Sequence, residues 1–244
     1  MTAYEQQAMD ELAKWQQKMQ LSPSFFGGLA KNLQTRINKI IPEKIHVAIT
    51  AAIKQMTRAV IFGSGFTTAS PLAEASLEDQ ELKVLQRVKF YTNTAATEGA
   101  ITGAGGILLG LADFPIWLTL KMKLLHEISS LYGYDVKEFK ERIFILYIFQ
   151  LTFSSRKERK RTYKLLENWY SEAHNLPQNI NEFDWRTFQL EYRDYIDLAK
   201  LIQLIPGIGA PVGAFVNHRL TKKLGKTAMN AYRLRWSQRR LLAK

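Results

Sequence analysis

The sequence predicts an all-α protein. Apolar residues recur at the three- and four-residue spacing of helices over most of the 244 residues, and proline, glycine or capping residues separate successive stretches. No segment combines strict polar–apolar alternation with turn residues, as half-buried strands would. We therefore expect an N-terminal helical arm with further helices over 1–70 and a larger helical domain over 71–244, which together form one compact unit.

The N-terminal stretch carries a narrow apolar stripe at i, i+4 and i+7 spacing. Its members are Tyr4, Ala8, Leu12, Trp15 and Met19. This spacing predicts an amphipathic helix whose apolar side needs a partner. After a break at 21–28, we expect a helix up to residue 41, another from Pro42 to about residue 62, and a loop at 63–71.

Capping signals predict the helices of the central region. Ser76 with Asp79 resembles a capping box and starts a helix that leads into a glycine-rich stretch. The next helix begins at Asp113 and ends at Gly133. Another begins at Asp135, and its body, RIFILYIFQLTF, could pass for a strand by its β-branched and aromatic content. The cap and the length of this segment favour a buried helix.

Three more helices are expected in the C-terminal third. The segment RKERKRTYKLLENWYSEAHNLP predicts a surface helix that ends near Pro177. Asp184 caps the following helix, which a proline and a glycine at 206–207 interrupt. The last helix covers roughly residues 211–240.

The stretch GAITGAGGILLGLADFP, residues 99–115, could be mistaken for a nucleotide-binding loop. Leu108 stands where a dinucleotide fingerprint requires its third glycine, and a helix rather than a strand precedes the motif. A second candidate, Gly-Lys-Thr at 225–227, lacks the first glycine of a P-loop, because Leu220 occupies that position. The sequence therefore indicates no nucleotide, and no cofactor of another kind.

Four glycines of this stretch fall within an arc of about 60° on a helical wheel. They are Gly99, Gly103, Gly106 and Gly110. Because glycine costs up to about 1 kcal/mol in a helix relative to alanine, an aligned set indicates the close approach of a second backbone. The candidate partner is the segment 206–213, in which Gly209 and Gly213 have the same spacing. Both segments contain prolines, so burial or shallow insertion is favoured over a membrane span.

Three blocks of the sequence resemble the EcsC protein family. They are ITGAGGILLGLADFPIWL, HEISSLYGYDVKEFKERIFIL and LIPGIGAPVGAFVNHRLTKKLGKTAMNAYRLR, and the similarity spans about residues 75–235. The motif positions are Asp113, Pro115, Tyr132, Gly133, Tyr134, Asp135, Pro206, Gly207, Gly209, Gly213 and Asn217. The resemblance implies a bacterial origin, a helical domain and a gene often associated with an ABC-type transporter. It names no activity.

The formal net charge of +12 is concentrated in the C-terminal segment. Ten lysines and arginines, and no acidic residue, follow Asp197. Seven cations of the expected last helix fall within a sector of about 100°. They are Arg219, Lys222, Lys223, Lys226, Arg233, Arg240 and Lys244. The opposite apolar side is expected to dock on the core and to leave the cations facing outward, which predicts binding to an anionic membrane surface. A basic tail without a partner is the alternative.

Residue chemistry argues against an enzyme or a metal protein. Cysteine is absent, the four histidines lack metal-ligand spacing, and no nucleophile–base pair is visible. Asp113 is better explained as a helix N-cap than as a ligand contact. Nucleic acid is a weaker anionic candidate than lipid, because no helix-turn-helix spacing, RNP motif or zinc finger is present.

We therefore expect a non-catalytic, cytoplasmic, peripheral membrane protein that is accessory to an ABC-type transport system. The cytoplasmic location follows from an N-terminus without a signal-type apolar segment. The alternative function is a soluble helical interaction module, an adaptor whose N-terminal arm recruits a partner protein.

Overall fold

The computed structural model describes residues 1–20, 68–72, 74–104, 114–172, 175–185, 187–188 and 209–242. Six helices of at least twelve residues, and no strand, are present in these ranges. They are α1 (Ala3–Gln20), α4 (Leu77–Ala104), α6 (Phe114–Leu131), α7 (Phe139–Phe153), α8 (Arg156–Glu167) and α10 (Gly209–Leu242). The prediction of an all-α protein is therefore confirmed.

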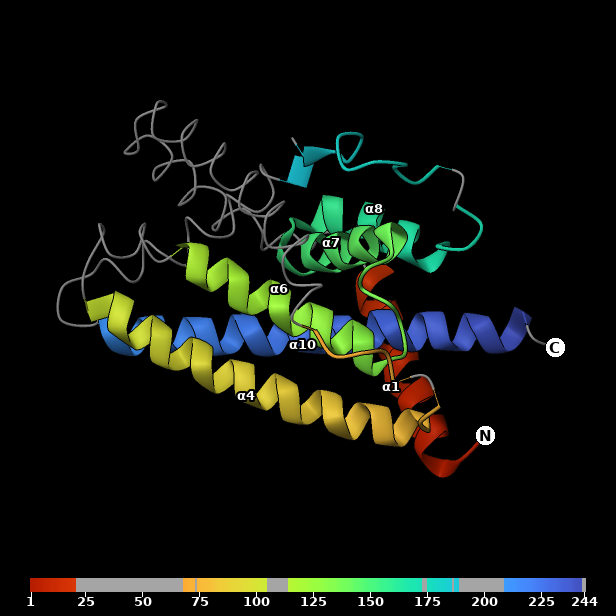
Figure 1. Ribbon diagram of the computed structural model, residues 1–244, viewed down its shortest axis with the longest axis horizontal. Coiled ribbons are helices and arrows are strands. Elements are labelled where there is room, and N and C mark those ends of the chain that lie inside the picture. Colours follow the sequence, from red (N-terminus) through yellow and green to blue (C-terminus); the bar gives the residue numbers. More distant parts are fainter. Residues whose placement is uncertain are drawn as a thin grey trace.

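The long helices α4 and α10 form an antiparallel pair that runs along the length of the molecule (Figure 1). Gly99 of α4 faces Gly213 of α10, and Val88 faces Gly225. A Cβ atom on Gly99 would lie 2.5 Å from the carbonyl oxygen of Gly213, and one on Gly225 would lie 2.6 Å from Cγ2 of Val88. The absence of a side chain at these two positions therefore permits the close approach of the two helices.

Helix α6 packs against both members of this pair and ends where the sequence predicts. Gly133 has a φ of 84°, the left-handed conformation that favours glycine just after a helix. The N–H groups of Gly133 and Tyr134 donate to the carbonyls of Ser130 and Ser129. These bonds satisfy carbonyl groups in the last turn of α6, and the chain then turns toward α7.

Helix α7 is buried on nearly every side, as the sequence predicts for this segment. Its start differs from the prediction. The helix begins at Phe139 and not at Asp135, and the Asp135 carboxylate instead accepts from the backbone N–H of Lys137 at 2.8 Å. Asp135 therefore stabilises the turn that precedes the helix and does not cap the helix itself.

The two following helix predictions have different outcomes. Ser155 is the N-cap of α8, but this helix ends at Glu167, well before the expected end near Pro177. The chain then continues in turns, from which Trp169 packs edge-on against Phe144 at a ring-centroid distance of 4.8 Å. The predicted cap at Asp184 is confirmed, since its carboxylate accepts from the N–H of Thr187 at 3.0 Å.

Helix α1 crosses α10 and also contacts α8 and α4 (Figure 1). Ala8, Leu12 and Trp15 are buried, and Trp15 packs edge-on against Tyr163 with ring centroids 5.6 Å apart. The predicted amphipathic helix is therefore confirmed. Its apolar stripe packs on the chain's own helices.

Several sequence predictions lie outside the described residues. These are the helices expected between residues 29 and 62, the motif residues Asp113, Pro206 and Gly207, and the glycines Gly106 and Gly110. Gly103, Pro115 and Gly209 fall inside α4, α6 and α10. None of the described helices is both long enough and apolar enough to cross a membrane.

Candidate functional site

The first half of α10 presents a cationic surface to solvent. Arg219, Lys222 and Lys226 are exposed, and with Phe215 they fall within an arc of about 60° on the helix. We call these three cations the open cationic face. Phe215 is 63% exposed and lies one turn before Arg219. An apolar side chain therefore extends the same face toward the start of α10.

The prediction that Arg233 also faces outward is wrong. Arg233 is only 5% exposed, because α1 covers this part of α10. Its Nη1 lies 2.7 Å from a carboxylate oxygen of Glu11, and its Nη2 lies 2.6 Å from one of Glu81. Arg240 is exposed but is engaged by Glu5 of α1 at 2.8 Å. Helix α1 thus supplies acidic partners to the second half of the predicted face.

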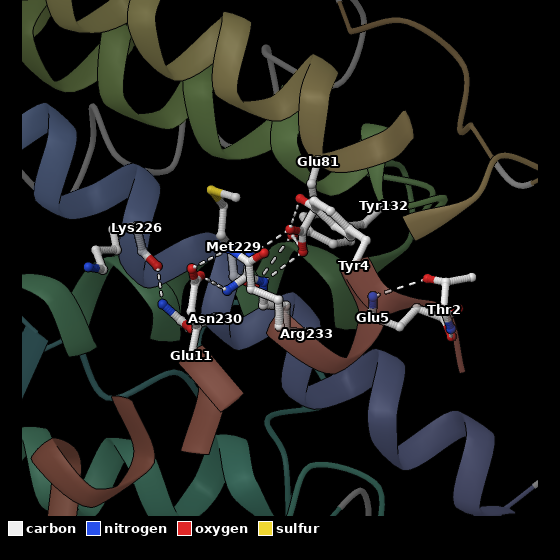
Figure 2. A network of polar contacts seen from close by, with 11 residues as sticks. Thr2, Tyr4, Glu5, Glu11, Glu81, Tyr132, Lys226, Met229, Asn230 and Arg233 are labelled. Atoms are coloured by element: carbon white, nitrogen blue, oxygen red, sulfur yellow. Dashed lines mark hydrogen bonds and ion pairs between the residues drawn. The ribbon is translucent and has the colours of Figure 1, made fainter. Parts of the chain in front are cut away.

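Glu81 is the centre of this buried network (Figure 2). Its two oxygens accept from Nε and Nη2 of Arg233 and from the hydroxyls of Tyr4, at 2.7 Å, and Tyr132, at 2.9 Å. Burial, reinforced by the neighbouring carboxylate, raises the pKa of Tyr132 well above its usual range. The hydrogen bond from Arg233 lowers the pKa of Glu11. The buried guanidinium of Arg233 and the carboxylate of Glu81 are thereby paired with each other and with polar groups of α1 and of the turn after α6.

A second buried ion pair lies next to the first. Glu141 of α7 accepts from Nη1 of Arg235, at 2.6 Å, and from the hydroxyls of Ser129 and Tyr232, at 2.7 and 2.6 Å. The guanidinium of Arg235 lies 3.8 Å from the ring centre of Tyr134. The sequence offered one signal for Arg235, since on the wheel it falls outside the sector of the seven cations and on the apolar side of the helix.

The two tyrosines of the Tyr-Gly-Tyr-Asp motif join these networks. Tyr132 donates to Glu81 and stacks on Tyr232 with ring centroids 5.1 Å apart, while Tyr134 lies against Arg235. Gly133 supplies the turn that directs both rings to the same side of the core. The motif is therefore placed where it stabilises buried charge.

Lys223 is half-buried and lies at the edge of the open cationic face, one turn after Arg219. Its Nζ donates to the backbone carbonyl of Thr152 at 2.6 Å, at the end of α7. Burial, and then the positive charges of Arg159 and Arg219, lower its pKa to about 8 from the usual 10.5. Lys223 therefore belongs to a different environment from Lys222 and Lys226.

Asn217 lies inside the protein, beside the contact of Gly99 with Gly213. Its Oδ1 accepts from the indole N–H of Trp117 at 2.8 Å, and its Nδ2 donates to Glu98 at 2.8 Å. A Cβ on Gly99 would lie 2.6 Å from the same amide nitrogen. Asn217 thus links α4, α6 and α10 at the glycine contact.

Metal chemistry finds no support in the part of the chain that the structure describes. No group of three or more histidine, aspartate and glutamate side chains there could hold a metal ion. His126 is fully buried, and its Nδ1 lies 2.8 Å from the carbonyl of Met122 in the same helix.

The chain belongs to the EcsC protein family, whose model matches residues 6–236. It is 44% identical over 228 residues to Protein EcsC of Bacillus subtilis (strain 168), which covers 93% of this chain and 94% of that protein. It is 30% identical over 251 residues to Uncharacterized protein YdbA of the same organism, with 94% and 91% covered. No solved structure matches the chain.

Proposed function

We propose that this protein attaches peripherally to anionic membrane surfaces through the open cationic face of α10. The observation that carries the proposal is the alignment of Arg219, Lys222 and Lys226, all exposed, on one side of the helix. Each lysine or arginine close to an anionic bilayer contributes about 1 kcal/mol. Three such residues favour reversible binding that weakens as salt screens the charges.

Phe215 supports a lipid partner rather than another polyanion. Its ring is 63% exposed on the same side of α10 as the three cations. Aromatic side chains next to lysine and arginine are typical of helices that lie at the membrane interface. Transfer of a phenylalanine ring from water into the acyl boundary of a membrane is favourable. Contact of the ring with the phosphodiester backbone of a nucleic acid buries no comparable apolar surface.

The proposed setting is the cytoplasmic face of the cell membrane, in an accessory role to an ABC-type transport system. The resemblance to the EcsC family is the basis for this setting. A non-catalytic attachment function requires no active site, and we propose none.

Vesicle flotation tests the attachment. The purified protein should float with vesicles that contain phosphatidylglycerol and not with neutral phosphatidylcholine vesicles, and high salt should release it. The double variant Lys222→Glu/Lys226→Glu should lose binding. The matched control Lys137→Glu/Lys140→Glu makes the same charge change at two exposed positions outside α10 and should still float.

Three results would count against the proposal. Equal loss in both double variants would show that only net charge matters. Flotation that resists salt would point to insertion of apolar segments, and absence of flotation would favour the adaptor function. The transporter setting needs its own test, in which recovery of the protein on cell membranes is compared with and without the transporter subunits.

A further inference from the structure

The contact between Val88 of α4 and Gly225 of α10 divides the surface of this helix pair into two sides. Each residue along an α-helix turns its side chain by about 100° in the right-handed sense. The two helices are antiparallel (Figure 1). Equal offsets from the contact along the two chains therefore turn the side chains toward the same side of the pair.

Helix α6 covers one of the two sides. Tyr91, three residues after the contact position of α4, is turned about 60° from the contact, and its hydroxyl donates to Glu127 of α6 at 2.8 Å. Asn217, eight residues before the contact position of α10, is turned about 80°, and it accepts from the indole N–H of Trp117 of α6 at 2.8 Å. Both turns lead to the same side, where α6 lies.

The side opposite α6 carries exposed residues of both helices. In each helix, the positions three before and one after the contact are turned about 60° and 100° toward this side. They are Leu85 and Lys89 in α4, and Lys222 and Lys226 in α10, and all four are exposed. We call these four residues the two-helix face. Leu82, three residues before Leu85, extends its apolar part, and the two leucines are 51% and 50% exposed.

We propose that the two-helix face lies against the anionic bilayer, so that α4 contacts the membrane together with α10 and α6 is turned away from it. The inference rests on the proposed function and extends it, because attachment through the open cationic face alone leaves Leu85 and Lys89 in water. It also fixes the orientation of the bound protein.

The composition of the two-helix face fits the interface of an anionic bilayer. Its three lysines are placed to meet phosphate headgroups, while Leu82 and Leu85 supply apolar surface for the acyl boundary. Lys222 and Lys226 also belong to the open cationic face, so the two surfaces are continuous. Two half-exposed leucines add little apolar area, so the lysines still make binding sensitive to salt.

A polarity-sensitive probe tests the orientation. The chain contains no cysteine, so one introduced cysteine can carry a nitrobenzoxadiazole fluorophore at a chosen position. With phosphatidylglycerol vesicles, the probe on Leu85→Cys should brighten, and spin-labelled lipid should quench it. The matched control is Ile116→Cys, at a position that is 56% exposed in α6 on the opposite side, and its probe should keep the spectrum it has in water. Equal changes at both positions, or none at either, would overturn the orientation.

Flotation of matched variants tests the apolar part of the face. Leu85→Ser should weaken binding to phosphatidylglycerol vesicles several-fold. Ile116→Ser removes an isomeric exposed side chain from α6 and should bind as the wild type does. Both side chains are exposed, so circular dichroism should show folded protein in each case. Equal binding of the two variants would contradict the contact of Leu85 with lipid.

The same assay tests the contribution of α4 to the charge. Lys89→Gln should weaken binding about fivefold, as expected for one lysine near an anionic surface, and Lys222→Gln should have a similar effect. The control is Lys83→Gln, since Lys83 is an exposed lysine of α4 that is turned about 140° from Val88 toward the other side. Equal losses for Lys83→Gln and Lys89→Gln would show that only net charge matters, and would overturn the face.

The outcomes separate this inference from the proposed function. If Leu85→Ser and Lys89→Gln bind as the wild type does while Lys222→Gln binds weakly, α4 does not touch the membrane and attachment through α10 stands. If the wild type floats with no lipid vesicle, the attachment itself is wrong. If it floats only with vesicles made from cell membranes, a membrane protein covers the face instead of lipid, and the inference is overturned.

Discussion

Glu11 of α1 and Arg233 of α10 approach each other to 2.7 Å, across 222 positions of the sequence. This ion pair lies where α1 crosses α10, and it marks the end of the open cationic face. Before this point Arg219, Lys222 and Lys226 are exposed, whereas Arg233 and Arg240 are paired with carboxylates of α1 and α4, and Arg235 is paired with Glu141 of α7. The carboxylates of α1 therefore separate Arg233 and Arg240 from the three exposed cations of the open cationic face.

The two carboxylates that bind Arg233 should differ greatly in their effect on stability. Glu81 is fully buried, and Glu81→Gln leaves a buried guanidinium without its main counter-charge, which costs about 3–5 kcal/mol. Glu11 is 52% exposed at its side chain, so Glu11→Gln should cost less than about 1 kcal/mol. Urea unfolding followed by circular dichroism measures both. Similar losses in the two variants would contradict the network as described.

Arg233 and Lys226 should separate folding from membrane attachment. Arg233→Gln should lower the free energy of unfolding and leave vesicle binding unchanged under conditions where the variant is folded. Lys226→Gln should weaken vesicle binding and leave the free energy of unfolding unchanged, since its side chain is exposed. The paired measurements are urea unfolding and flotation with phosphatidylglycerol vesicles. Weaker flotation of folded Arg233→Gln would show that Arg233 contacts the membrane after all.

The glycine contacts between α4 and α10 should tolerate added methyl groups to different degrees. Gly99→Ala brings a Cβ against the backbone of Gly213, which cannot rotate away, so we expect a loss of about 1–3 kcal/mol. Gly225→Ala meets the side chain of Val88, and the additional change Val88→Ala should restore part of the stability. Thermal unfolding of the single and double variants tests this. A melting temperature unchanged in Gly99→Ala would show that the helices separate without cost.

Local signals in the sequence were sufficient to predict most of the helices in the part of the chain that the structure describes. Ser76 and Asp184 make the expected capping bonds, and Gly133 ends α6, because caps and stops depend only on neighbouring residues. The start of α7 was predicted too early, since Asp135 uses its carboxylate in the preceding turn. The predicted α8 is too long, because the apolar periodicity of the segment continues past Glu167, where the helix ends and turns begin.

The candidate site could be predicted only in part, because a helical wheel shows one helix without its neighbours. It placed Arg219, Lys222 and Lys226 on one side correctly, as exposure confirms. It could not show that α1 brings Glu11 onto Arg233, or that Lys223 reaches the end of α7. These contacts join residues far apart in the sequence. The acidic residues Glu5 and Glu11 of the N-terminal amphipathic helix were a signal in the sequence that the basic helix has a partner within the chain.

The lowered pKa of Lys223 predicts how stability changes with pH. Below about pH 8 the amine is charged in both states, and the folded protein bears the cost of holding that charge in a half-buried place beside two arginines. Between about pH 8 and 10.5 the folded state has released this proton while the unfolded chain still holds it. The unfolded state then binds more protons, so the contribution of Lys223 to stability rises with pH.

The buried tyrosines set the upper limit of this window. Burial raises the pKa of Tyr132 and Tyr232 well above the usual 10.0, so above pH 10 the unfolded chain releases phenolic protons that the folded protein retains. Their effect lowers stability as pH rises further. Between pH 7 and 9.5 the free energy of unfolding, measured with urea, should therefore rise with pH. The variant Lys223→Met should reduce the slope of this rise. The exposed-site control Lys226→Met should keep the wild-type slope, and an unchanged slope in Lys223→Met would place the lowered pKa on another group.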